Sequence, residues 1–339
     1  MRNTDDLFVE PEENSYDFRE RYLRIVDGYR MYRIVRAALD AGLFNYMDTL
    51  ASAEDIARMA GTDPGMTGLV CDALVKAGFV ENVGGMYRNT DSSRLYLSSL
   101  SGLSMKGTYD MIHKGLEAWD HVDEALREGC FPIPEAPDRF YHSMTAFGEF
   151  SKGGFISALM NFIEDEWMVR GSKLLDVAGG HGLYSVAIAS RYPDVEVHYF
   201  DRDVGVRVAE DNFGKYGYDI PIHTGDYYAG DIPGTYDILV SSFNDSACKP
   251  ELVSKIAGAV RPGGLVILRR YVIEMNDPIE RVIQANIVRP KGSELRSGHR
   301  GQPPEERAEF ERATAEYGFV PIKRESTDDG TEMIAYRVN

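Results

Sequence analysis

The sequence predicts an α/β protein in which a mostly helical N-terminal part precedes a parallel sheet that ends in an antiparallel hairpin. Three observations predict this. Apolar residues recur at helical spacing through the first part of the chain. From Ser172 onward, short apolar runs alternate with helical patterns, which is typical of a parallel sheet. Two strand patterns joined by a tight turn, Phe319 to Ser326 and Thr331 to Val338, predict the antiparallel edge.

The composition is that of a globular protein with about two domains. The 339 residues are 43% hydrophobic and 27% charged, and the net charge of -17 disfavours binding to nucleic acid or to an anionic membrane. The three cysteines fit neither a disulfide framework nor a zinc spacing; they are Cys71, Cys130 and Cys248. The acidic N-terminus is unlike a signal peptide, and no apolar run approaches the ~20 residues that span a bilayer. We therefore expect a soluble, cytoplasmic protein.

Residues 1–102 are expected to form an acidic arm, up to Asp17, and a small helical domain. A helical pattern runs from Phe18 to Leu43, and Gly42 stands where this helix would stop. The segment that follows predicts two short helices and a hairpin, which is the order of a winged helix.

Local signals place each element of this winged-helix pattern. Ser52 caps a helix over 53–60, Asp63 and Pro64 open a second one, and Gly84-Gly85 form the turn of the hairpin. DNA binding is one interpretation of such a domain. However, residues 52–98 hold four basic against six acidic residues, which is wrong for contact with phosphates. We therefore interpret the domain as structural and dimer-forming.

Residues 103–170 are predicted to be a helical connector, interrupted by the proline-rich segment 131–137. The stretch from Phe140 to Phe162 is dense in aromatic residues, Met and Gly. Most of these side chains are expected in the core, and the others in the lining of a ligand pocket.

Residues 171–339 carry the predicted nucleotide site. A strand over 173–177 is followed by the glycine-rich turn 178–182 and then by a helix, so backbone N–H groups and the positive helix end can face a ligand. The next strand ends at Asp201, whose carboxylate can accept two hydrogen bonds from a ribose diol. A dinucleotide fingerprint has a third glycine, but Ser185 stands there, which makes a nicotinamide dehydrogenase a remote alternative. Together with Asp176 and the C-terminal hairpin, this favours S-adenosylmethionine.

The chain resembles the class I methyltransferases and, more closely, the homodimeric small-molecule O-methyltransferases with an N-terminal winged-helix dimerisation domain. The motifs that carry this resemblance are 37–44, 175–182, Phe200-Asp201, Gly225-Asp226-Tyr227-Tyr228, 236–240 and 260–267. Ala178 stands where glycine is usual. The resemblance implies a Rossmann-like seven-stranded sheet, a homodimer, and S-adenosylmethionine converted to S-adenosylhomocysteine without a metal ion. It assigns cofactor binding to Asp176, Ala178, Gly179, Gly180, Gly182, Asp201, Arg202, Asp226, Tyr227 and Ser242.

One departure from the family concerns the catalytic histidine, which lies just after the fourth strand and is followed by Asp-Trp. Here Asn244 and Asp245 occupy the place and Trp is absent. A neutral amide cannot be a general base at pH 7. Three interpretations remain open: transfer by alignment alone, with Asn244 and Asp245 assisting; another base, for which His142 is the candidate; or a different reaction, such as C-methylation or one without methyl transfer.

The acceptor is expected to be a small aromatic or cyclic molecule covered by Phe140, Tyr141, Met144 and Phe147. Residues 281–301 hold five basic residues against one acidic residue. Two of them, Arg289 and Arg296, are candidates for binding an anionic acceptor, since guanidinium groups suit carboxylate or phosphate. A solvated basic loop is the other interpretation. A winged-helix regulator that senses a ligand is a remote alternative to the enzyme.

Overall fold

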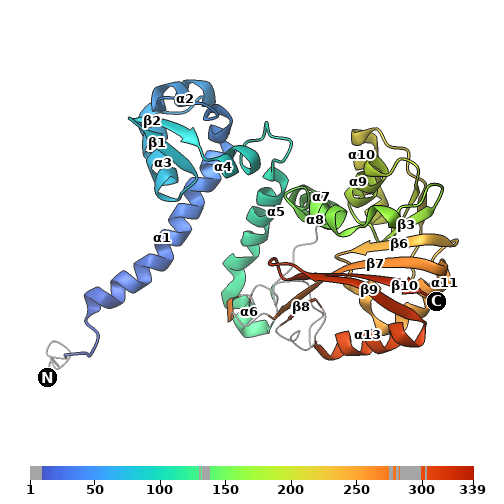
Figure 1. Cartoon of the computed structure of the whole chain (residues 1–339). Helices are drawn as coiled ribbons and strands as arrows, with labels where there is room; N and C mark the ends of the chain where they lie inside the picture. The colour runs from blue at the N-terminus through green and yellow to red at the C-terminus, as the bar shows by residue number, and fades with distance from the viewer. Residues whose placement is uncertain are drawn as a thin grey trace. The chain divides into compact units, whose positions relative to one another are not determined.

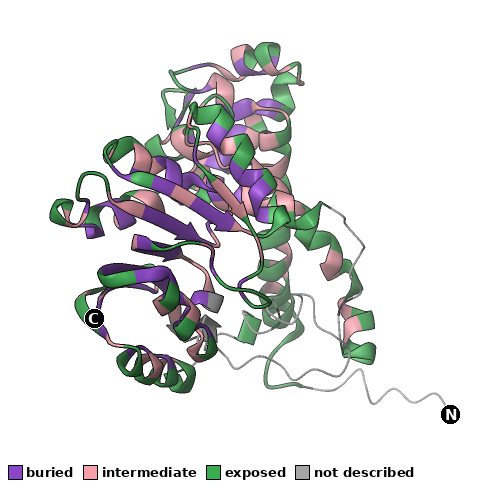
Figure 2. Cartoon of the chain, turned by 90° about the vertical axis from the view of Figure 1, so that its right-hand side faces the viewer, coloured by how far each residue is buried: buried purple, intermediate pink, exposed green. Residues whose placement is uncertain are grey.

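The computed structural model describes residues 10–129, 131, 138–274, 278–279, 282, 299–301 and 304–339. The chain divides into two compact units, Met1–Lys106 and Gly107–Asn339 (Figure 1). In the second unit, the side chains of the central strands and of the inner helix faces are buried, whereas the outer helix faces and the edge strand Phe319–Ser326 are mostly exposed (Figure 2).

The first unit contains the winged-helix order that the sequence predicts. Its elements are α1 (Ser15–Asp40), η2 (Leu43–Tyr46), α2 (Ala53–Ala60), α3 (Pro64–Lys76), β1 (Val80–Val83), β2 (Met86–Asn89) and α4 (Asp91–Tyr96). The predicted caps are formed, because Ser52 accepts from the Asp55 N–H and Asp63 accepts from the Met66 N–H.

The long first helix differs from the prediction at both ends. It begins at Ser15, inside the expected arm, because the Asn14 side chain accepts from the N–H groups of Tyr16 and Asp17. It ends at Asp40, before Gly42, which has a left-handed φ of 66° and leads into η2. The end of the arm is therefore helical from Ser15 on.

The second unit begins with a series of helices and continues into the sheet. The helices before the sheet are α5 (Lys106–Leu116), η3 (Glu117–His121), α6 (Val122–Glu128), α7 (Arg139–Ser151), α8 (Phe155–Phe162) and η4 (Asp165–Trp167). The predicted interruption at 131–137 lies almost wholly outside the described residues.

The sheet alternates with helices as the sequence predicts. Its elements are β3 (Lys173–Val177), α9 (Leu183–Arg191), β4 (Glu196–Asp201), α10 (Asp203–Tyr216), β5 (Ile222–Thr224), β6 (Tyr236–Ser242), η5 (Asp245–Cys248), η6 (Pro250–Leu252), α11 (Val253–Ala259), β7 (Val260–Glu274), β8 (His299–Gly301), α13 (Pro304–Glu316), β9 (Phe319–Ser326) and β10 (Thr331–Val338).

The strand order is β5-β4-β3-β6-β7-β10-β9, and the short β8 pairs with β7 outside this path. The pairs β5-β4, β4-β3, β3-β6 and β6-β7 are parallel, whereas β10 is antiparallel to both β7 and β9. The seven-stranded sheet with its antiparallel C-terminal hairpin is therefore confirmed. Because β3, β4 and β6 are parallel neighbours, the loops that follow them meet at one edge of the sheet.

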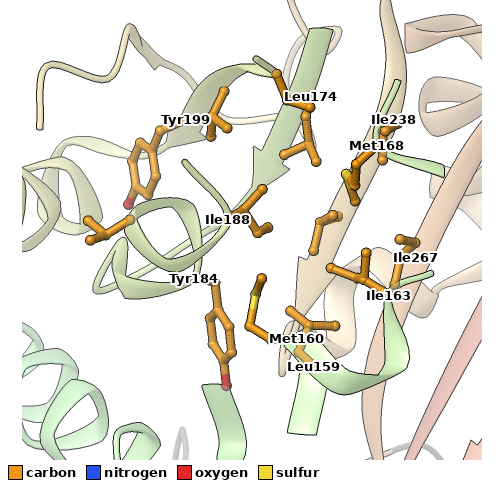
Figure 3. Close-up of a cluster of buried hydrophobic side chains, with 14 of the residues drawn as sticks. Leu159, Met160, Ile163, Met168, Leu174, Tyr184, Ile188, Tyr199, Ile238 and Ile267 are labelled. Carbon is orange, nitrogen blue, oxygen red and sulfur yellow. The ribbon is translucent and has the colours of Figure 1, made fainter. Parts of the chain in front are cut away.

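The two faces of the sheet carry separate apolar clusters. One cluster packs α8, α9 and α10 on the sheet and includes Leu174, Ile188 and Tyr199 (Figures 1 and 3). The other packs α11 and α13 on the opposite face and includes Val253, Ile256 and Phe310 (Figure 1). The strands are thus held from both sides, which fixes the positions of the loops at their ends.

Candidate functional site

The glycine-rich turn joins β3 to α9 through several left-handed residues. Ala178, Gly180 and Gly182 have φ values of 52°, 55° and 70°. A side chain at Gly182 would place its Cβ 2.8 Å from a ring carbon of Phe213, so both conformation and space require glycine there. Ala178 adopts a left-handed conformation in the position where the family usually has glycine.

Asp201 at the end of β4 contacts this turn directly. Its Oδ2 accepts a 2.8 Å hydrogen bond from the Gly180 N–H and a 3.2 Å bond from the Tyr199 hydroxyl. Its Oδ1 accepts from the N–H of Arg202, whose side chain is exposed. A carboxylate and a left-handed glycine, 21 residues apart in sequence, therefore lie together as the sequence predicts.

Asp176 lies beneath the turn and is fully buried. Its Oδ2 accepts a 2.6 Å bond from the Ser185 hydroxyl, and its Oδ1 is buried with no hydrogen-bond partner among the described residues. Burial raises the pKa of Asp176 to about 7; the Ser185 bond opposes this shift and the charge of Asp201 adds to it. A cationic group bound at this turn would favour the ionised form.

A second loop, Asp226–Gly230, follows β5. Asp226 is exposed and its Oδ1 accepts from the Tyr228 N–H, so it is also the acid of a local turn. The Tyr227 side chain is buried and its ring lies edge-on to Phe200. Lys255 fixes the loop from α11, because its Nζ donates to the carbonyls of Tyr227, Tyr228 and Gly230.

The loop after β6 brings Asn244 to Tyr227. Asn244 Nδ2 donates a 2.7 Å bond to the Tyr227 hydroxyl. The Ser242 Oγ is buried and has no hydrogen-bond partner among the described residues. Asp245 begins η5, but its side chain lies outside the described structure.

Helix α7 brings part of the predicted acceptor lining to the same place. The Met144 sulfur lies 3.2 Å from where a Gly180 Cβ would stand, and the Phe147 ring packs on His181 and Phe243. Tyr141 bonds instead to Asp211 on α10.

Two further predicted residues of α7 are exposed. The His142 ring packs edge-on against Tyr141, and none of its described contacts is with Asn244, so its position does not favour a role as base. Phe140 is also exposed, at 38%, and has no described ring contact. Arg289 and Arg296 lie outside the described residues, as does Cys130.

The sequence reasoning missed His181, a residue of the turn whose side chain is buried against α7. Its Nδ1 accepts from the Leu183 N–H, and its Nε2 lies 3.2 Å from the Ser151 hydroxyl. Burial lowers the pKa of His181 to about 4, so the ring is neutral at pH 7 and its Nε2 carries the proton toward Ser151. Its position between Gly180 and Gly182 was the available signal.

Within the described parts of the chain, no three His, Cys, Asp or Glu side chains are grouped to hold a metal ion. Among those same residues, no helix has the length and apolar character that crossing a membrane requires.

The strand order, the glycine turn after β3 and the acid after β4 define a class I methyltransferase. Residues 158–294 match the family model of the O-methyltransferase domain, and residues 23–99 match that of the O-methyltransferase dimerisation domain. The chain belongs to this O-methyltransferase family, whose members are S-adenosylmethionine-dependent methyltransferases. The dimerisation domain supports a homodimer.

Individual relatives are distant. An uncharacterised protein of Methanocaldococcus jannaschii is 22% identical over 296 residues, which are 84% of this chain and 80% of that protein. Acetylserotonin O-methyltransferase of Mus musculus is 25% identical over 272 residues, which are 69% of this chain and 66% of that protein. Human N-acetylserotonin methyltransferase, solved in complex with SAM, is 20% identical with a TM-score of 0.68, covering 98% of this chain and all of that one.

Proposed function

We propose that the protein transfers a methyl group from S-adenosylmethionine to a small aromatic or cyclic acceptor, without a histidine as general base. The observation that carries the proposal is the 2.8 Å contact between Asp201 and the Gly180 N–H. It supports a site in which one carboxylate and bare backbone face the same nucleoside.

The donor-binding residues follow from the turn and the two loops beside it. Asp201 would accept hydrogen bonds from the ribose diol, and Gly180 and Gly182 would let the ligand lie against backbone. Asp176 would attract the ammonium group, directly or through water. The ring of Tyr227 would stack on the face of the adenine, and the carboxylate of Asp226 would accept a hydrogen bond from its amino group. When bound, S-adenosylmethionine supplies a methyl group already activated by its positively charged sulfur.

The acceptor would lie between the glycine-rich turn and Asn244, against the apolar side chains of α7. Met144 at Gly180 and Phe147 at Phe243 support this location. Such a lining suits a flat, apolar ring. The anionic character of the acceptor rests on Arg289 and Arg296 and stays a prediction.

The reaction would depend on alignment more than on proton transfer. Asn244 is neutral and cannot remove a proton at pH 7, so the chain's contribution is to hold the acceptor in line with the methyl group and to exclude water. A phenol or thiol that ionises near neutral pH would need no further base.

Binding of S-adenosylhomocysteine tests the donor site. Isothermal titration calorimetry of the wild-type chain should show binding, and Asp201→Asn should weaken it about tenfold or more through loss of charge-assisted hydrogen bonds. Asp203→Asn is the matched control, since Asp203 is an exposed acid two residues further on at the start of α10. A wild-type chain that binds neither S-adenosylmethionine nor S-adenosylhomocysteine would disprove the proposal.

Asn244 stands where the family has its catalytic histidine, and this also favours a second candidate function. In it, the protein methylates carbon or uses the bound cofactor without transferring a methyl group. Metabolite extracts incubated with the protein and S-adenosylmethionine separate these cases. A product heavier by one methyl group on oxygen, nitrogen or sulfur supports the main proposal. The same gain on carbon, or a converted product without any gain, supports the second.

A further inference from the structure

Phe243, the residue that separates β6 from Asn244, has a left-handed backbone. Its φ of 57° is unusual for a residue with a bulky side chain, so its surroundings must hold it there. The Phe243 N–H donates a 2.8 Å bond to the Arg269 carbonyl. Its ring packs against Phe147, Phe155 and Tyr271, with centroids 4.8 to 5.3 Å away.

The Arg269 side chain completes this enclosure. It is 1% exposed, and its guanidinium carbon lies 4.6 Å from the Phe243 ring centroid. Its nitrogens donate to the Phe155 carbonyl, the Asp329 carboxylate and the Thr331 hydroxyl. Arg269 is therefore fixed by its own bonds, and it holds the Phe243 ring in one position.

The direction in which Asn244 leaves β6 follows from the conformation of Phe243. With Phe243 in this conformation, Asn244 lies where its Nδ2 donates a 2.7 Å hydrogen bond to the Tyr227 hydroxyl. The loop Asp226–Gly230 is thus held at two points, through its carbonyls by Lys255 and through its buried tyrosine by Asn244.

We propose that Asn244 is a positioning residue of the donor site: through the Tyr227 hydroxyl it holds the loop that contacts the adenine. The residue at the place of the family's base would then act on the methyl donor, whereas a base would act on the acceptor. An amide suits this role because its N–H groups donate at every pH, whereas an imidazole donates according to its tautomer and charge. The inference rests on the proposed function, because it takes Tyr227 as an adenine contact.

A double-mutant cycle on S-adenosylhomocysteine affinity tests this proposal and requires no acceptor. Calorimetry on the full chain compares wild type, Tyr227→Phe, Asn244→Ala and the double variant. Each single change removes one hydrogen-bond partner and should raise Kd by about threefold to tenfold. The double variant should be no weaker than the weaker single variant, because both changes remove the same bond.

Tyr192→Phe is the matched control. It removes the hydroxyl of another tyrosine, which donates a 2.8 Å hydrogen bond to Asp165. Tyr192 lies at the C-terminal end of α9, and the glycine turn lies at the other end of this helix. This variant should keep the wild-type Kd. Thermal unfolding without ligand should show that both single variants are folded at the temperature of the titration, so that a raised Kd reports the donor site and not a loss of the fold.

The outcomes separate this inference from the proposed function. If wild type does not bind S-adenosylhomocysteine, the proposed function fails and the inference fails with it. If wild type binds but Tyr227→Phe and Asn244→Ala bind equally well, only the inference is overturned. It is also overturned if the two effects multiply in the double variant, because independent effects exclude a shared bond.

Discussion

We expect the buried carboxyl of Asp176 to make donor binding dependent on pH. Its pKa is about 7 in the ligand-free chain, raised chiefly by burial. If the ligand's ammonium binds next to Asp176, it favours the ionised carboxylate. Below pH 7 the Asp176 carboxyl is mostly protonated and must therefore lose a proton for the ligand to bind. We therefore expect the affinity for S-adenosylhomocysteine to increase as the pH rises from 6 to 8.

The size of the effect follows from the fraction of ionised Asp176. With a pKa of about 7, roughly a tenth of the carboxyl is ionised at pH 6 and most of it at pH 8. Kd should therefore fall about tenfold between these values, a difference of about 1.4 kcal/mol in binding free energy. His181, with a pKa of about 4, and Tyr184 and Tyr199, whose pKa values are raised by burial, stay neutral over this range.

Calorimetry at pH 6, 7 and 8 measures this dependence, with Asp176→Asn as the control variant. The amide cannot ionise, so the variant should bind weakly at every pH and should report any titration of the ligand itself. A second control is 5′-methylthioadenosine, which lacks the ammonium and should bind the wild-type chain equally at each pH. A wild-type Kd that is constant, or that follows the same pH dependence as the Asn variant, would refute the assignment of Asp176.

Three further predictions concern the turn, the dimer and the buried arginine. Gly182→Ala should lower the free energy of unfolding by about 1–3 kcal/mol in urea titrations, because φ is 70° and Phe213 leaves no room; unchanged stability would contradict the strain. Ile25→Glu should shift the homodimer toward monomer in light scattering, since Ile25 is 73% exposed on α1 and belongs to an apolar face of that helix; an unchanged mass would exclude this face as the interface. Arg269→Met should lower the free energy of unfolding by about 2–4 kcal/mol, because it leaves Asp329 without its cation; Arg269→Lys should lose less, and equal losses would show that the charge does not matter.

The first unit could be predicted closely because its signals are local. Ser52 and Asp63 cap the helices at the residues where the sequence places them, since a cap needs only its own side chain and the next three N–H groups. The start of α1 was placed too late because Asn14 is an equally good cap within a segment whose charge indicated a solvated arm.

The sheet shows where local signals fail. The motif 260–267 resembles the turn into the fifth strand of the parallel series, but it does not show where that strand ends, and β7 continues to Glu274. Arg269 and Arg270 of this strand are charged, yet both are buried, because Asp329, Glu311 and Glu332 from later elements neutralise them. Partners some 40 to 60 residues away leave no periodic pattern at the strand itself.

In the candidate site, too, some contacts could be predicted from the sequence and others could not. The approach of Asp201 to Gly180 could be predicted, because parallel neighbouring strands end at one edge of a sheet. The bond between Asn244 and Tyr227 could not, since it depends on how two loops fold back over that edge. The exposure of His142 likewise depends on the rotation of α7 about its axis, which a stretch of mixed aromatic residues does not determine.

The bond between Arg269 and Asp329 has a consequence for the synthesis of the protein. Asp329 lies in the turn between β9 and β10, and β10 pairs antiparallel with β7. The ring of Phe243 therefore acquires its complete surroundings only after the chain has been synthesised beyond Asp329 and this hairpin has joined the sheet. A chain cut before Asp329 would retain every motif of the nucleotide site and still lack the anchor for the loop beside it.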